Sequence, residues 1–217
     1  MRKPVVTAAV AAAALFLAPT NASAQVPERS QTWNDVTLAT TLVAGGAQLL
    51  MPRVYYSSPE ATVGWKARWH VSVLAPAMTL TTLALLNEHH FKPGFEGHRP
   101  GCNEANQGQP GCESYGMPST HSFGSAAALG HGTAVFLVDT IKYSGGRFHF
   151  GSFAGNVILP LALTSVTVAG RRAGDWEDWG QIGVGAGAGL VSGAAMGLLY
   201  AILQPPDCGY TGSLICW

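Results

Sequence analysis

The segment "IGVGAGAGLVSGAAMGLLYAIL", residues 182–203, is an uncharged run of apolar and small residues. It is too long for a typical strand, so we expect a helix. Within it Gly185, Gly189, Gly193 and Gly197 recur at every fourth residue. Small residues at this spacing let helices approach closely, in a membrane or in a tightly packed water-soluble core. We therefore expect this segment to pack against a neighbouring helix through its glycines.

Four further apolar segments without a charged residue lie before it in the chain. They are rich in Ala, Gly, Thr and Leu, and their lengths also favour helices over strands. These segments are residues 36–51, 71–87, 122–138 and 153–170. Together with a possible first helix at the amino end, they predict an all-α bundle of about five to six helices.

The amino end has the three parts of a secretory signal, in the expected order: a basic start, an apolar stretch and a small-x-small cleavage site. These parts are Arg2 with Lys3, residues 5–18, and Ala22-Ser23-Ala24. We expect residues 1–24 to be a signal peptide or, as the alternative, an uncleaved first helix. Residues 25–217 are then expected to form a single domain, because their number suits one domain with its own core.

Membrane insertion is indicated by the number of uncharged segments and by the position of the basic residues. A helix that spans a bilayer needs about 17–25 residues, and four of the segments are close to or below the lower end of this range. The mean hydropathy of the chain is only +0.20. Five such segments are nevertheless unusual for a soluble bundle. Cytoplasmic loops of membrane proteins carry an excess of Lys and Arg. The two short loops expected to be cytoplasmic contain such residues: Arg53, Lys66, Arg68, Lys142 and Arg147. We expect a bacterial-type inner-membrane protein with residues 88–121 and 171–181 facing the periplasm; the alternative is a soluble periplasmic protein.

The four cysteines predict two local disulfides, Cys102–Cys112 and Cys208–Cys216, because an even number in an exported chain is typical of disulfide bonding. Free thiols are an alternative. So is a metal site, but the spacings match no common zinc pattern, and we expect no metal. If all the helices span, Cys208 and Cys216 would lie in the reducing cytoplasm, where disulfides are rare. Lys and Arg together equal Asp and Glu in number, which argues against nucleic acid as a partner.

Polar residues concentrate in three clusters, all on the side expected to face the periplasm. The clusters are Lys92 to Pro100 ("KPGFEGHRP"), Pro118 to His121 ("PSTH") and residues 170–180 ("GRRAGDWEDWG"). Lys92, Arg99 and Arg171 could converge on one anion, with Ser119 and the amides of a helix start adding hydrogen bonds. Taken singly, Ser119 is explained as a helix cap and His121 as a packing residue.

Together the clusters resemble the type 2 phosphatidic acid phosphatase family, which includes the vanadium haloperoxidases. The family motifs are K-x6-R-P, P-S-G-H and S-R-x5-H-x3-D. Lys92 and Arg99-Pro100 match the first motif, and Pro118, Ser119 and His121 match the second, with Thr120 in place of glycine. The resemblance implies a helical bundle in which a phosphate group binds to Lys92, Arg99, Ser119, Thr120 and Arg171. It also implies that His121 protonates the leaving group and that no cofactor is needed.

The third motif departs from the family pattern. With Arg171 at the arginine position, Glu177 stands where the family has its nucleophilic histidine, and Gln181 stands at the aspartate. Three outcomes are open. A carboxylate, Glu177 or Asp178, could attack phosphorus, since carboxylates do so in aspartyl-phosphate enzymes. A histidine could take a new role, the candidates being His121, His89, His90 and His98. The protein could also bind phosphate-bearing ligands without turnover.

On this basis we expect a phosphatase or phosphotransferase acting on a lipid phosphate or diphosphate at the periplasmic face, with His121 and Glu177 as catalytic residues. The alternative is a catalytically degenerate member of the same fold that binds phospholipid or a partner protein. The expected partners are a phosphorylated lipid or another phosphate ester, and the membrane.

Overall fold

The computed structural model describes residues 28–50 and 71–203, and within these ranges the chain forms five helical rods without any β-strand. The rods are α2 (Gln31–Leu50); α3 (Val71–Leu86) continued by η1 (Asn87–Phe91) and α4 (Lys92–Phe95); α5 (Thr120–Val138) continued by η2 (Asp139–Tyr143); α6 (Phe150–Phe153) continued by η3 (Ala154–Ile158) and α7 (Leu159–Ala173); and α8 (Trp179–Leu203). The predicted all-α class is confirmed. The predicted signal, residues 1–24, and the predicted Cys208–Cys216 pair lie outside the described residues.

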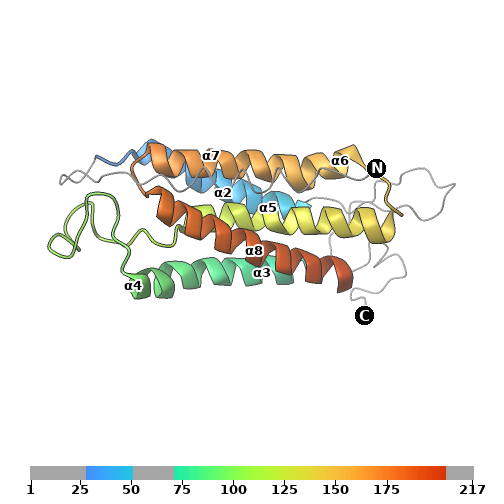
Figure 1. Ribbon diagram of the computed structural model, residues 1–217, viewed down its shortest axis with the longest axis horizontal. Coiled ribbons are helices and arrows are strands. Elements are labelled where there is room, and N and C mark those ends of the chain that lie inside the picture. The colour runs from blue at the N-terminus through green and yellow to red at the C-terminus, as the bar shows by residue number, and fades with distance from the viewer. Residues whose placement is uncertain (1–27, 51–70, 204–217) are drawn as a thin grey trace, which may run out of the picture.

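The glycine face of α8 packs directly on α5, which lies in the middle of the bundle (Figure 1). A side-chain carbon added at any of the four glycines would collide with backbone of α5. The facing pairs are Gly185 with Ser119, Gly189 with Phe123, Gly193 with Ala127, and Gly197 with His131. From each pair to the next, the residue number rises by four in both helices. The two helices therefore run parallel and stay in contact over about three turns. This packing places the start of α8 beside the start of α5.

Hydrogen bonds of threonine side chains join α2 to α7 and to α5, and they fix the position of α2 along the axis of the bundle. The hydroxyls of Thr40 and Thr167 are 2.8 Å apart, and Thr41 Oγ1 donates to the carbonyl oxygen of His121 at 3.2 Å. Asn34, about two turns earlier on α2, thereby reaches the last turn of α7. The starts of α2, α5 and α8 and the end of α7 therefore meet at one end of the bundle.

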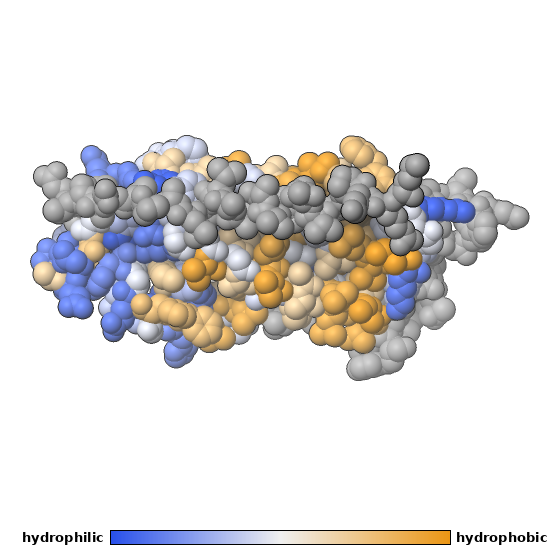
Figure 2. Space-filling view, in the orientation of Figure 1, coloured by the Kyte–Doolittle hydropathy of each residue, from blue (hydrophilic) through white to orange (hydrophobic). Residues whose placement is uncertain are grey.

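The surface divides into a polar end and an apolar body. Figure 2 shows hydrophilic residues gathered at the end where the loop between α4 and α5 lies, and hydrophobic residues over much of the rest of this face. Large side chains such as Leu161 on α7 and Val191 on α8 are at least half exposed. In the described part of the chain, residues Phe150–Ala173 and Trp179–Leu203 are each long and apolar enough to cross a membrane. These features are compatible with membrane association.

The loop between α4 and α5 is fastened at several points. The predicted Cys102–Cys112 disulfide is present. Gly116 N donates to Gly97 O at 2.8 Å, closing the neck of the loop. Gln181, in the first turn of α8, donates through Nε2 to the carbonyl oxygen of His98 at 2.6 Å. The loop is thus held against the polar end of the bundle, where it positions Arg99.

Candidate functional site

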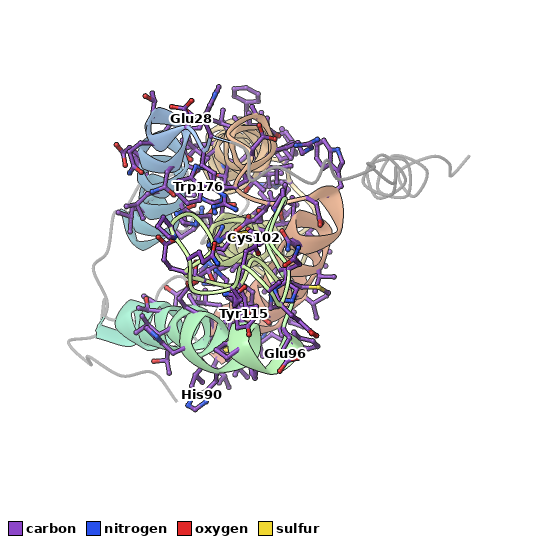
Figure 3. All side chains as sticks on the ribbon, turned by 90° about the vertical axis from the view of Figure 1, so that its left-hand side faces the viewer. Glu28, His90, Glu96, Cys102, Tyr115 and Trp176 are labelled. Atoms are coloured by element: carbon purple, nitrogen blue, oxygen red, sulfur yellow. A yellow bond between two sulfur atoms is a disulfide. The ribbon has the colours of Figure 1, made fainter. Side chains whose placement is uncertain are left out.

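The three polar clusters found in the sequence meet at the polar end of the bundle. Viewed from that end, the disulfide loop with Cys102 and Tyr115 lies across the helix ends, and Trp176 lies beside it (Figure 3). The first cluster lies in α4 and the loop after it, the second at the start of α5, and the third at the end of α7, in the turn that follows and at the start of α8. Four of their charged side chains are buried: Lys92, Arg99, Arg171 and Glu177 are each at most 7% exposed.

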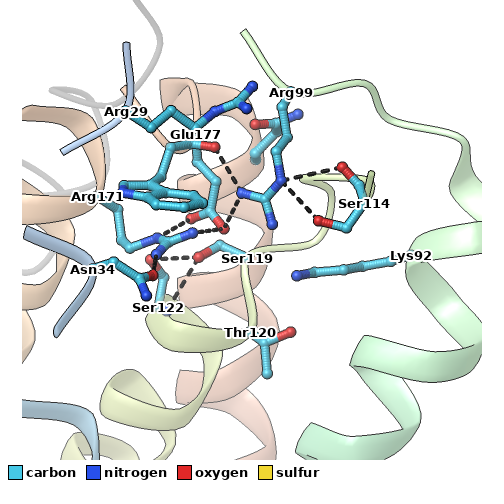
Figure 4. Close-up of polar contacts among 12 residues, drawn as sticks. Arg29, Asn34, Lys92, Arg99, Ser114, Ser119, Thr120, Ser122, Arg171 and Glu177 are labelled. Atoms are coloured by element: carbon cyan, nitrogen blue, oxygen red, sulfur yellow. Dashed lines mark hydrogen bonds and ion pairs between the residues drawn. The ribbon is translucent and has the colours of Figure 1, made fainter. Parts of the chain in front are cut away.

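Glu177 is the centre of this arrangement. Its carboxylate receives two hydrogen bonds from Arg171, one from Nη2 to Oε1 at 2.9 Å and one from Nε to Oε2 at 3.1 Å. Arg99 Nη1 is 3.9 Å from the same Oε1, and the Ser119 hydroxyl is a further hydrogen-bond partner of the carboxylate. Two guanidinium groups and a hydroxyl therefore surround one fully buried carboxylate (Figure 4).

Glu88 has the same role for the other two predicted phosphate ligands. Its Oε2 lies 2.6 Å from Lys92 Nζ, and it accepts a hydrogen bond from Thr120 Oγ1 at 2.5 Å. The side-chain amide of Asn87 donates to Thr120 Oγ1 and to the carbonyl oxygen of Pro118, which fixes the start of α5 against η1. All five residues predicted to bind phosphate thus contact a carboxylate of the protein, either the buried Glu177 or the partly exposed Glu88.

Both carboxylates are stabilised in their charged form. Burial raises the pKa of Glu177, but Arg171, together with Ser119 and Arg99, outweighs burial and holds that pKa below its ordinary value. Burial likewise opposes ionisation of Glu88, and its contacts with Lys92 and Thr120 lower its pKa overall. At neutral pH the cluster therefore holds two carboxylate anions against the cations of Lys92, Arg99 and Arg171.

His121 lies in the first turn of α5, within electrostatic range of both carboxylates. Burial is the main cause that lowers its pKa, to about 4; the charges of Arg171 and Lys92 lower it further, and those of Glu177 and Glu88 oppose the shift. His121 is therefore a neutral imidazole at neutral pH. Of the other candidate histidines, His89 and His90 are exposed, and His98 pairs with Gln107 in the loop.

Arg99 is held on two sides. Its Nε donates to the carbonyl oxygen and the hydroxyl of Ser114, each at 3.1 Å, and its Nη1 donates to the carbonyl oxygen of Trp176 at 2.9 Å. The indole ring of Trp176 has the guanidinium carbons of Arg29, Arg99 and Arg171 within 5.2–5.8 Å of its centroid. Cation–π attraction stabilises such contacts, so Trp176 keeps two cluster arginines close together despite their like charge.

The remaining charged and polar residues of the third cluster serve local structure. Asp178 and Gln181 form a reciprocal capping box at the start of α8: Gln181 N donates to Asp178 Oδ1, and Asp178 N donates to Gln181 Oε1. Arg172 pairs with Asp175 at 2.9 Å outside the buried cluster. Gln181 therefore anchors both the start of α8 and the disulfide loop.

Several partners in the site were not expected from the sequence. Glu88 could have been found, because it precedes Lys92 by four residues and such pairs face each other on a helix. Asn34, which accepts from Arg171 Nη1 at 2.8 Å, and Ser114 come from distant segments. No local pattern in the sequence points to either.

A scan against protein-family models, a search of curated proteins and a search of solved structures each returned no match. Within the described residues, no three His, Cys, Asp or Glu side chains come together in a way that could hold a metal ion.

Proposed function

We propose that this protein recognises the phosphate group of a lipid phosphate or another phosphate ester, on a bundle of the type 2 phosphatidic acid phosphatase kind. The ligands of the phosphate are Lys92, Arg99, Ser119, Thr120 and Arg171. We place the site at the periplasmic face of the membrane, because the expected topology puts all three polar clusters on that side.

One observation carries the proposal: Glu177 Oε1 lies between two guanidinium groups, and the Ser119 hydroxyl is a further partner of the same carboxylate. A phosphoryl oxygen requires the same partners, because guanidinium groups bind carboxylate and phosphate oxygens with similar geometry. The contacts of Glu88 with Lys92 and Thr120 repeat this arrangement at a second position. The two carboxylates thus mark where the anionic oxygens of a ligand would bind after displacing them.

The same geometry favours binding over turnover through a carboxylate nucleophile. Both oxygens of Glu177 accept hydrogen bonds from Arg171, and the side chain is completely buried. A nucleophile needs an accessible lone pair directed at phosphorus. We therefore propose the degenerate, phosphate-binding form as the first candidate function.

Hydrolysis through His121 is the second candidate, and the neutral state of this imidazole favours it. A neutral nitrogen can attack phosphorus, forming an N–P bond as the P–O bond to the leaving group breaks. The departing oxygen takes a proton from water, and the hydroxide so formed cleaves the N–P bond, which returns the imidazole and releases phosphate. In this mechanism His121 replaces the missing nucleophile of the family. The alternative role, protonation of the leaving group, requires that a bound phosphate first raise the pKa of His121.

The experiment is to incubate the purified full chain with phosphatidic acid or undecaprenyl diphosphate and to measure both bound ester and released phosphate. Binding without release supports the first candidate, and release that His121→Asn abolishes supports the second. No binding and no release would contradict both. A matched variant, Glu177→His with Gln181→Asp, restores the family motif; turnover gained only in this variant would show that Glu177 is what prevents catalysis.

A further inference from the structure

A groove of about 300 Å³ runs between α2, α3 and α5, below the charged cluster. Its lining contains one titratable side chain, His131, but no Asp, Glu, Lys or Arg, and most of its lining residues are small or apolar. Representative lining residues are Thr41, Gly45 and Gln48 on α2, Ala84 on α3, and Gly124 and Ala128 on α5. Its volume is at the lower end of the range found for small-molecule sites.

The groove begins about one helical turn below the cluster. Ala84 precedes Glu88 by four residues on the α3–η1 rod, and Gly124 follows Thr120 by four on α5. Thr41, at the same end, hydrogen-bonds the backbone of His121. At 1.5 Å per residue, the seven residues from Thr41 to Gln48 give the groove a depth of about 10 Å. The chain of a ligand whose phosphate lies in the cluster therefore has to cross only about one helical turn to enter the groove.

At the far end of the groove, the side-chain amide of Gln48 is buried without a hydrogen-bond partner in the described part of the chain. This holds for both its nitrogen and its oxygen. Buried polar atoms are nearly always hydrogen-bonded, and leaving one unpaired is unfavourable. Gln48 lines the groove, so a ligand in the groove is in a position to supply the missing donor or acceptor.

We propose that the groove binds the hydrocarbon chain of the same ligand whose phosphate occupies the cluster, and that Gln48 hydrogen-bonds a hydroxyl or carbonyl group on that chain. This inference rests on the proposed function and narrows the ligand to a chain-bearing phosphate ester with a polar group remote from the phosphate. In this arrangement the mostly apolar groove binds the hydrocarbon chain, the adjacent cluster binds the phosphate, and Gln48 binds the second polar group of the ligand.

The first test blocks the groove. At Gly45 an added side-chain carbon meets no atom within 4 Å, so Gly45→Leu places its side chain in open space. Gly187→Leu on α8 is the matched control, since that position is equally open and does not line the groove. Binding of dodecyl phosphate and butyl phosphate is measured by titration calorimetry on the full chain in a nonionic detergent. We expect Gly45→Leu to weaken dodecyl phosphate about tenfold, the equivalent of roughly two unburied methylene groups, and to leave butyl phosphate unchanged. Equal affinity of Gly45→Leu and the native protein for dodecyl phosphate would overturn the proposal.

The second test addresses Gln48 and does not depend on the first variant. The native protein is expected to bind ω-hydroxydodecyl phosphate about two- to tenfold more tightly than dodecyl phosphate, the usual effect of one hydrogen bond. Gln48→Leu should remove or reverse this preference. The same ratio of affinities in both proteins would exclude Gln48 as the partner of the chain.

Dodecanol, which carries the chain without the phosphate, separates this inference from the proposed function. If Gly45→Leu weakens dodecanol binding while no phosphate ester binds, the proposed function fails and the groove remains a chain site. If phosphate esters bind with an affinity that does not depend on chain length, the inference about the groove fails and the proposed function stands.

Discussion

Replacing Glu177 by glutamine tests how the cluster is held together. The change keeps the shape of the side chain but removes the charge that neutralises Arg171. Arg171 is 1% exposed, so its guanidinium would remain buried without a counter-ion. Breaking a buried ion pair from one side costs about 3–5 kcal/mol, and because glutamine retains one oxygen acceptor we expect a loss near the lower end, about 3 kcal/mol.

Phosphate should reverse much of this loss. A phosphate anion can take the position of the missing carboxylate between Arg99 and Arg171. A ligand that binds only the folded state stabilises it by about 2.7 kcal/mol when present at a hundred times its Kd. In the native protein the gain should be smaller, because phosphate must first displace Glu177 from Arg171.

The assay is thermal unfolding of the full chain in a nonionic detergent, in phosphate and in chloride at equal ionic strength. The matched control is Glu104→Gln, which changes the charge equally at an exposed loop position and should leave both Tm values unaltered. A Glu177→Gln protein that is as stable as the native one would refute the account of the ion pair. A destabilised variant that phosphate does not rescue would refute the anion site.

Three further predictions concern His121, the glycine face and the disulfide. Because its folded pKa of about 4 lies below the ordinary 6.5, His121 contributes stability that is present above pH 6.5 and is lost as pH falls towards 4. The loss is on the order of 3 kcal/mol, and His121→Gln should flatten the curve of unfolding free energy most clearly between pH 6.5 and about 5.5, before the carboxylates begin to take up protons. Gly193→Ala places a carbon against the α5 backbone and should cost about 1–3 kcal/mol, whereas Gly187→Ala, at an open position, should be neutral or stabilising in the same melts. Replacing Cys102 and Cys112 by serine loosens the loop that carries Arg99 and its partner Ser114. We expect about 2–4 kcal/mol lower stability and at least about tenfold weaker phosphate binding; unchanged binding would show that the loop is positioned without the disulfide.

The helices and their glycine face could be predicted because they depend on local pattern. Gly185 to Gly197 recur with the period of one helix face, and that period is visible without any knowledge of the neighbour. The neighbour itself, α5, could not be predicted, because each of the uncharged segments offers small residues and only tertiary packing selects among them. The apolar composition predicted helices long enough to span a membrane, and the structure contains two of them in its described part.

The sequence predicted which residues belong to the site, but it did not predict which of them pair with one another. Spacing identified Lys92, Arg99 and Arg171 as residues for one anion, and the structure brings them to the same end of the bundle. The same reasoning placed Glu177 at the position of a nucleophile, where it is in fact bound on both oxygens by Arg171. A partner six residues away across a turn follows from three-dimensional geometry, for which the sequence has no short-range signal.

Recognition of a phosphate group by this cluster is tested by the equilibrium Kd of dodecyl phosphate for three proteins: the native chain, Arg99→Ala and Arg172→Ala. Arg172 is the control, because its guanidinium pairs with Asp175 outside the cluster. Hydrogen bonds to charged groups contribute about 1.5–3 kcal/mol, so we predict that Arg99→Ala weakens binding by at least about tenfold while Arg172→Ala leaves it within about twofold of native. Equal affinities of all three proteins, or a larger loss in Arg172→Ala than in Arg99→Ala, would contradict the claim.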